Sequence, residues 1–270
     1  MTTHETPHTN KKTARIVGSL FLIATATYIF GSGLLDSILN APDYLSHVSP
    51  KRAQVVLGVL LQYGDAAAVA AIGIVLFPIL RKHNEVIALG YAGTRIIECL
   101  LLIGAGIGSL SLIKLSQGFI QAGSPESSSF QELGNLVVAQ SGLAFQVAMI
   151  ALGLGSMPFC YLLYRSRLIP RAMAVLGFVG YAALFIGGVF ELFGLNLSMV
   201  HYLPGGLFEL VLPIWLIVKG FTSPAIASDA GIIESRAVGV PAIGKTARAP
   251  AARPGGPAPP AAGTNPTANR

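Results

Sequence analysis

Residues 86–113, VIALGYAGTRIIECLLLIGAGIGSLSLI, form an apolar run that contains two charged residues, Arg95 and Glu98. About 20 apolar residues are enough for a helix to cross the hydrocarbon core of a bilayer, which is about 30 Å thick. Arg95 and Glu98 are three positions apart, so in a helix they share one face and can form an ion pair. The stretch therefore predicts a transmembrane helix with a charged pair inside the membrane.

The same kind of run occurs six times along the chain. The runs are Ile16–Leu35, Ala53–Leu80, Val86–Ile113, Leu133–Tyr164, Leu168–Leu195 and Val200–Phe221. Hydrophobic residues make up 53% of the 270 residues, charged residues make up 11%, and the mean hydropathy is +0.65. Because soluble chains carry about 25% charged residues, this composition excludes an ordinary soluble enzyme. We expect an all-α, polytopic transmembrane helical bundle with about six spans, since an open sheet cannot satisfy its backbone in lipid.

The distribution of Lys and Arg predicts the orientation of the bundle. Nine basic residues would face the cytoplasm if the N-terminus does: Lys11, Lys12, Arg15, Arg81, Lys82, Arg165, Arg167, Arg171 and Lys219. Three would lie outside: Lys51, Arg52 and Lys114. Basic residues accumulate in cytoplasmic loops, so both termini are expected to be cytoplasmic. The longer loops, Asp36–Arg52 and Lys114–Glu132, would then be external.

Three regions are expected along the chain. Residues 1–12 form a cytoplasmic N-terminal segment, residues 13–221 form the six-span transmembrane domain, and residues 222–270 form a tail. The tail is rich in Pro, Ala and Gly and poor in large apolar residues, which is typical of a disordered cytoplasmic extension. An alternative is that the first run is a signal peptide cleaved near Ala24-Thr25-Ala26. The run continues to Leu35, which favours a retained span.

Charged side chains within the spans are the candidate functional residues, because charges are costly in lipid. Counting along the helices places Asp65, Arg95, Glu98 and Glu209 near the membrane midplane. Gln146 adds a polar amide at a similar depth. This layer is the predicted ligand-binding site.

Two further residues lie nearer the expected external surface. Glu191 is close to the outer end of the fifth run, and His201 is at the start of the sixth. They could flank an aqueous vestibule above the midplane layer, where the imidazole would titrate near neutral pH. An ordinary position at the interface explains them equally well.

The midplane layer has more acids than bases, and three interpretations remain open. Arg95 bridges several helices, or one carboxyl group is neutral because burial disfavours its charge, or a bound cation or protonated ligand completes the site. In the structural alternative, the same residues only fix helix packing, as polar side chains in membranes often do.

No motif indicates catalysis, a metal or a cofactor. Zinc-protease and phosphate-loop sequences are absent, and Ala139-Gln140-Ser141-Gly142 lacks the first glycine of an intramembrane serine protease motif. Cys99 and Cys160 both lie in apolar runs, so a disulfide or zinc site has little support. The net charge of +6 is spread over short flanks, which argues against nucleic acid as a partner. The expected partners are the lipid bilayer and a small-molecule or cation ligand, and protein partners cannot be inferred.

Three stretches carry a resemblance to a known family. They are Tyr91-Ala92-Gly93-Thr94-Arg95-Ile96-Ile97-Glu98, then Leu168-Ile169-Pro170-Arg171, and finally Glu209 followed by Leu212-Pro213-Ile214-Trp215-Leu216-Ile217-Val218-Lys219-Gly220-Phe221. The chain from about Lys11 to Phe221 resembles the bacterial multi-pass membrane family called domain of unknown function 4386. The resemblance implies a bundle of six to seven helices in the bacterial inner membrane and supplies no mechanism. We expect a protein that binds or transports a small molecule or ion, or alternatively a non-catalytic structural or assembly subunit.

Overall fold

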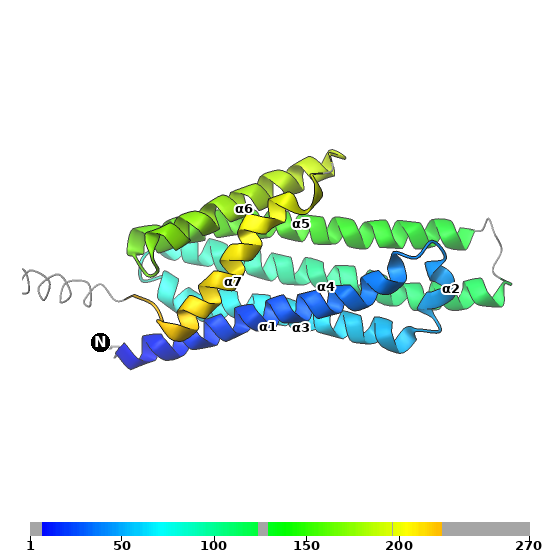
Figure 1. The fold of residues 1–270 in the computed structure, drawn as a ribbon, viewed down its shortest axis with the longest axis horizontal. Helices are drawn as coiled ribbons and strands as arrows, with labels where there is room; N and C mark the ends of the chain where they lie inside the picture. The colour runs from blue at the N-terminus through cyan, green and yellow to red at the C-terminus, as the bar shows by residue number, and fades with distance from the viewer. Residues whose placement is uncertain (1–6, 124–128, 196, 223–270) are drawn as a thin grey trace, which may run out of the picture. The chain divides into compact units, whose positions relative to one another are not determined.

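The protein is a bundle of helices. The computed structural model describes residues 7–123, 129–195 and 197–222, and all regular elements within them are helical. They are α1 (Pro7–Leu39), α2 (Tyr44–Val48), α3 (Arg52–Leu80), α4 (Glu85–Gln121), α5 (Ser129–Ser166), α6 (Arg171–Leu192), the 3₁₀ helix η1 (Ser198–Tyr202) and α7 (Leu203–Val218) (Figure 1). The chain divides into two compact units, Met1–Ser228 and Asp229–Arg270. The second unit lies outside the described residues, as does nearly all of the expected tail.

Six helical segments in the described part of the chain are long and apolar enough to cross a membrane. They are Lys11–Leu39, Arg52–Leu80, Glu85–Gln121, Ser129–Ser166, Arg171–Leu192 and Met199–Val218. Each overlaps one of the six apolar runs of the sequence. The expected all-α fold with six spans is therefore confirmed.

The six long helices form a closed ring in chain order. Each packs against the next, from α1 through α3, α4, α5 and α6 to α7, and α7 packs back against α1. The short helix α2 lies beside α4 and α1. Figure 1 shows α7 crossing the bundle obliquely, from α6 at its N-terminus to the first half of α1 at its C-terminus. The ring encloses an interior that all six spans can line.

Glycine contacts fix the tilt of α7. A Cβ atom on Gly180 of α6 would lie 2.6 Å from the backbone nitrogen of Gly205, so the α6 and α7 backbones touch near the start of α7. A Cβ on Gly18 of α1 would lie 2.8 Å from the Ile217 side chain near the end of α7. Small residues allow such close approach in membranes. One end of α7 is thus held by α6 and the other by α1.

Buried apolar side chains form two main clusters, one toward each end of the bundle. The cluster at the end that carries the N-terminus of α1 draws on all six spans, for example Val17, Leu76, Tyr91, Leu163, Leu184 and Leu212. The cluster at the α2 end contains Leu35, Ile38, Tyr44, Leu45, Val48, Val55, Val59, Leu112, Ile113 and Phe119. Asp65 on α3 and Arg95 and Glu98 on α4 lie along their helices between residues of these two clusters.

The prediction of a loop over Lys114–Glu132 is wrong, because much of this segment is helical. The helix α4 continues to Gln121, and α5 begins at Ser129. One lysine ends the apolar run in the sequence, but Phe119 remains buried and its ring packs edge-on against Phe130 of α5, 6.4 Å between centroids. Packing between the two helices therefore extends both beyond the run.

The ends of other helices also differ from the apolar runs. Residues 7–12 of the expected N-terminal segment belong to α1. The last run begins as η1, and Pro204 then lies in the first turn of α7, where a missing backbone N–H costs nothing. Pro213 is within α7, which continues as a helix to Val218.

Candidate functional site

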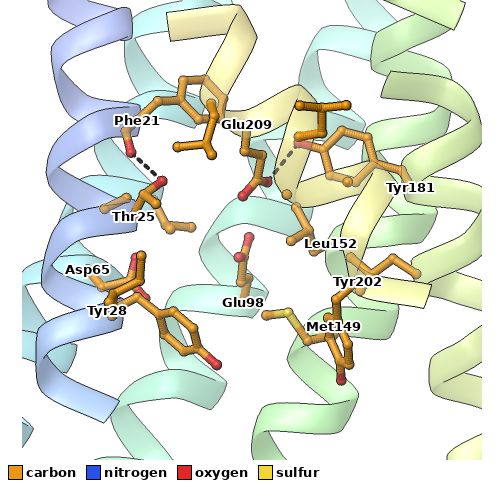
Figure 2. Close-up of a pocket in the computed structure, with 18 of the residues that line it drawn as sticks. Phe21, Thr25, Tyr28, Asp65, Glu98, Met149, Leu152, Tyr181, Tyr202 and Glu209 are labelled. Atoms are coloured by element: carbon orange, nitrogen blue, oxygen red, sulfur yellow. Dashed lines mark hydrogen bonds between the residues drawn. The ribbon is translucent and has the colours of Figure 1, made fainter. Parts of the chain in front are cut away.

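A cavity of about 560 Å³ lies inside the ring, and we call it the central cavity (Figure 2). All six spans line it. The polar lining residues come from five of them: Thr25 and Tyr28 of α1, Asp65 of α3, Arg95 and Glu98 of α4, Tyr181 of α6, and Tyr202 and Glu209 of η1 and α7, whereas α5 contributes apolar residues such as Met149. The four charged residues predicted at one depth therefore share one cavity. That shared position follows from the ring, since no two neighbouring helices supply all of them.

The cavity lies deep within the spans. Asp65 is about 20 Å from either end of α3, and Glu98 is about 20 Å from the start of α4, at a rise of about 1.5 Å per residue. Thr25 is midway between Lys11 and Leu39 of α1. Each of these residues is thus far from both ends of its helix, where water would normally solvate a polar group.

Arg95 and Glu98 form a buried ion pair on one face of α4. The distance from Arg95 Nη1 to Glu98 Oε2 is 3.1 Å, and each residue is 2% exposed. Arg95 Nε also donates to the Tyr91 hydroxyl oxygen at 3.0 Å, one helical turn earlier. The guanidinium lies 5.5 Å from the centre of the Phe21 ring of α1, in cation–π range. Arg95 therefore forms its ion pair within α4. It does not connect several helices through ion pairs in the described residues.

The positions of Arg95 and Glu98 follow from local sequence. Asn84 caps the start of α4, where its side chain accepts a hydrogen bond from the Ile87 backbone N–H at 3.0 Å. On the facing helix α3, residue 73 is glycine, and a Cβ there would lie 3.0 Å from Arg95 Cβ. The glycine lets α3 pack closely beside the arginine. One guanidinium nitrogen, Nη2, is buried without a hydrogen-bond partner within the described residues.

Glu209 is held by a tyrosine of the neighbouring helix. The Tyr181 hydroxyl donates to Glu209 Oε1 at 2.9 Å across the interface of α6 and α7. The Tyr181 ring is fully buried and packs edge-on against Phe208, 5.7 Å between centroids. Figure 2 shows the carboxyl groups of Glu209 and Glu98 pointing toward each other inside the cavity.

Asp65 has a different environment from the other two acids. Its residue is 7% exposed and lines the cavity, and it has no hydrogen bond or ion pair within the described ranges. It is near enough to Arg95 and Glu209 to interact with both electrostatically. A buried carboxyl group without a partner is costly, so Asp65 is the acid of the cavity that most needs a further contact.

The other three predicted site residues do not line the central cavity. Gln146 of α5 is adjacent to it, because Gln146 Oε1 accepts a hydrogen bond from the Tyr202 hydroxyl at 3.3 Å. His201 Nε2 lies 3.6 Å from Glu191 Oε1, and the imidazole packs directly against Gly187 of α6. Glu191 and His201 thus form a separate pair between α6 and η1.

Sequence reasoning missed the tyrosines of the cavity. Tyr28, Tyr181 and Tyr202 line it, and Tyr181 holds one of its acids. Tyrosines in membrane proteins concentrate at the two interfaces with water. Tyr181 is ten residues into α6, about 15 Å from its start, so its depth alone could have marked it as part of a polar interior.

The chemistry available in the cavity is that of carboxyl groups and phenols around a single guanidinium. Carboxylates accept hydrogen bonds and attract cations, and tyrosine faces stabilise organic cations. In the described residues, no three His, Cys, Asp or Glu side chains come together in a way that could hold a metal ion. The arrangement suits a ligand that carries a positive charge and donates hydrogen bonds.

Comparison with known proteins gives a family and no further relatives. No curated protein and no solved structure matches the chain. One family model matches residues 16–220, which include the first span from Ile16 onward, the other five spans and every residue of the central cavity. Since this match covers most of the chain, the protein belongs to the family described as domain of unknown function (DUF4386).

Proposed function

We propose that this multi-pass membrane protein binds a small organic cation in the central cavity, as a transporter or a sensor. Asp65 carries the proposal, because it is a buried acid that lines a cavity and has no partner within the described residues. Buried polar groups in proteins are nearly always paired, and the exceptions call for an explanation. A positively charged group bound beside Asp65 would supply the missing partner.

The charges of the cavity favour a cation over an anion. Three acids and one base line it, and the base is already paired with Glu98. Glu209 accepts one hydrogen bond from Tyr181, and this leaves its second carboxyl oxygen available. A cation between Asp65 and Glu209 would balance the excess of acids in a region where an unpaired charge is expensive.

The size of the cavity favours an organic molecule over a bare ion. Its volume of about 560 Å³ falls within the range of about 300–1,000 Å³ that is usual for small-molecule sites. Apolar side chains such as Val69, Met149 and Leu152 make up much of its wall. A ligand with an apolar body and a cationic group would contact both parts of this lining.

Membrane and orientation belong to the same proposal. We place the protein in the bacterial inner membrane because it resembles a bacterial membrane family, and both termini in the cytoplasm because of the distribution of Lys and Arg. The α2 end of the bundle then faces outward. In this orientation the acids of the central cavity lie between the two membrane surfaces, and Met199, a lining residue at the start of the last span, lies on the outer side.

Binding can be tested with three probes of one shape and different charge: 1-adamantylamine, 1-adamantanol and 1-adamantanecarboxylate. The purified full chain in nanodiscs is unfolded thermally with each probe. We expect the amine to stabilise the protein, by about 1.4 kcal/mol at ten times its Kd, and the carboxylate to have no effect. A flat response to all three probes would overturn the proposal.

The matched variants are Asp65→Asn and Asp36→Asn. Asp36 is an exposed acid of α1 that does not line the cavity. Asp65→Asn should abolish stabilisation by the amine, and Asp36→Asn should preserve it. If the cluster only fixes helix packing, Asp65→Asn would instead lower the unfolding temperature of the free protein, and no probe would stabilise the parent chain.

A further inference from the structure

We infer that the central cavity opens to the lipid between α1 and α7, and that its ligand is a hydrophobic amine that reaches Asp65 and Glu209 from within the bilayer. This inference rests on the proposed function, because it names the route and the class of the ligand of the same site.

The first observation is that α1 and α7 separate toward the α2 end. They touch where Gly18 meets Ile217, near the opposite end of the bundle. Further along α1, a Cβ on Gly31 would lie 2.9 Å from the Gly58 carbonyl oxygen, so this half of α1 packs against α3. The corresponding half of α7 packs against α6. The helices α1 and α7 are therefore in close contact at one end of their interface. Toward the α2 end, α1 packs against α3 and α7 packs against α6 instead of against each other.

The apolar core shows the same asymmetry. Among the described helices, the cluster at the α2 end is built from α1 to α5 and receives nothing from α6 or α7. The cluster at the opposite end includes residues of all six spans. From Glu209 toward the α2 end, no cluster of buried apolar side chains in the described helices therefore connects α7 to α1.

The rim of the cavity is apolar and exposed. Ile29 of α1 is 59% exposed, and Leu203 and Leu207 at the start of α7 are 65% and 52% exposed. All three line the cavity, together with the exposed residues Met199 and Leu210. A polar member of the rim, Tyr28, is 36% exposed, whereas a mouth that opened to water would be expected to carry mostly polar side chains. Exposed apolar side chains of a membrane span are solvated by lipid chains. The deep wall, with Asp65 and Glu98, is buried in the same cavity.

Gly206 marks the opening. Its neighbour Gly205 is explained by contact with Gly180, but a Cβ on Gly206 would meet nothing within 4 Å. Gly206 is exposed and also lines the cavity. A glycine in a helix costs about 1 kcal/mol relative to alanine, and no packing contact requires this one. Its effect is to leave space between the rim and the acids.

The geometry of the opening selects the ligand. Figure 2 shows Thr25 and Tyr28 on one side of the cavity and Tyr181 and Tyr202 on the other, with Glu98 and Glu209 between them. A molecule that arrives through the rim passes apolar side chains before it meets the carboxyl groups. An amine on an apolar body partitions into the bilayer and can pair with these groups on arrival, whereas a strongly hydrated cation would first have to leave water.

Access is tested by fluorescence quenching in nanodiscs. The chain has one tryptophan, so Trp215→Phe gives a silent background in which Phe145→Trp places a reporter in the cavity wall. We expect lipids brominated in mid-chain to quench this reporter and aqueous iodide to leave it unchanged. Tyr28→Trp, at the lining residue whose ring stacks on Phe145 with 5.7 Å between centroids, is a second reporter if the first variant does not fold. Quenching by iodide, or by neither agent, would overturn the lateral opening.

The opening itself is tested by filling it. Gly206→Phe should protect the reporter from brominated lipid and weaken binding of 1-adamantylamine by about tenfold or more. Gly142→Phe is the matched control, because Gly142 of α5 is also exposed, has no neighbour within 4 Å of a Cβ and does not line the cavity. Quenching that persists unchanged in Gly206→Phe would show that lipid reaches the reporter elsewhere and would overturn the inference.

The two proposals fail in different ways. If brominated lipid quenches the reporter but no amine binds, the proposed function is wrong and the opening stands. If 1-adamantylamine binds while iodide quenches the reporter, the cavity binds amines but opens to water, and the lateral route is wrong. Ethylamine serves as the hydrophilic comparison, and an affinity equal to that of 1-adamantylamine would overturn the assignment of a hydrophobic ligand.

Discussion

At the scale of single residues, the ion pair of Arg95 and Glu98 combines a structural part with a binding part. Its two charges are almost fully buried and pair with each other within α4, and Arg95 has Tyr91 as a further partner. Glu98 nevertheless lines the central cavity beside two acids that Arg95 does not pair with. The pair therefore contributes to the packing of α4 in the bundle, while the carboxyl groups of Asp65 and Glu209 remain available to bind a ligand.

Removal of one member of this pair should be costly. In Arg95→Leu, the Glu98 carboxyl group and the Tyr91 hydroxyl lose their partner, and we expect the free energy of unfolding to fall by about 3–5 kcal/mol. The double variant Arg95→Leu/Glu98→Leu should recover most of that loss, because no buried charge is left unpaired. Reversible unfolding in mixed micelles measures both. A single variant as stable as the parent chain would show that the pair contributes nothing to the fold.

The sequence predicted the acids and the arginine of the cavity and the pairing of Arg95 with Glu98, but not the partners that lie on other helices. Depth along each helix follows from counting residues, and this was enough to place Asp65 and Glu209 at one level. Hydrogen bonds depend on how the helices are rotated and tilted, which counting does not give. The bond from Tyr181 to Glu209, and the separation of His201 from the cavity, could be found only with the ring in place.

At the scale of helices, glycine contacts decide which spans touch. The backbones of α6 and α7 meet at Gly180 and Gly205, and this contact sets the start of α7 away from α1. Apolar runs locate such helices reliably, since composition defines a span. Their ends are less predictable, because packing partners such as Phe119 and Phe130 can extend a helix beyond its apolar run.

The contact between α6 and α7 can be tested by adding volume. Gly180→Val should destabilise the protein by about 1–3 kcal/mol, because its side chain would collide with the Gly205 backbone, which cannot rotate away. Gly104→Val is the control, since Gly104 of α4 is exposed and a Cβ there meets nothing within 4 Å. Unfolding in mixed micelles compares the two. Equal stability of both variants would mean that α6 and α7 do not approach as closely as described.

At the scale of the whole molecule, the ring explains why distant parts of the sequence serve one site. The acids lie on α3, α4 and α7, and they meet because α7 closes the ring against α1. A chain with these six spans in another order of packing would have the same composition and no common cavity. The order of the helices around the ring is thus the feature that the sequence alone did not supply.

The orientation of this ring in the membrane is the last prediction, and the two ends of α4 can report it. His83 lies two residues before the start of α4, and Gln121 is the last of its 37 residues. Both are exposed, and they lie at opposite ends of the helix. We substitute each with cysteine in a chain whose Cys99 and Cys160 are alanine, and treat intact cells with a membrane-impermeant maleimide. Because basic residues such as Arg81 and Lys82 gather at the start of α4, Gln121→Cys should be labelled directly and His83→Cys only after permeabilisation. The reverse pattern would place the α2 end, and with it the lateral opening, on the cytoplasmic half of the bilayer.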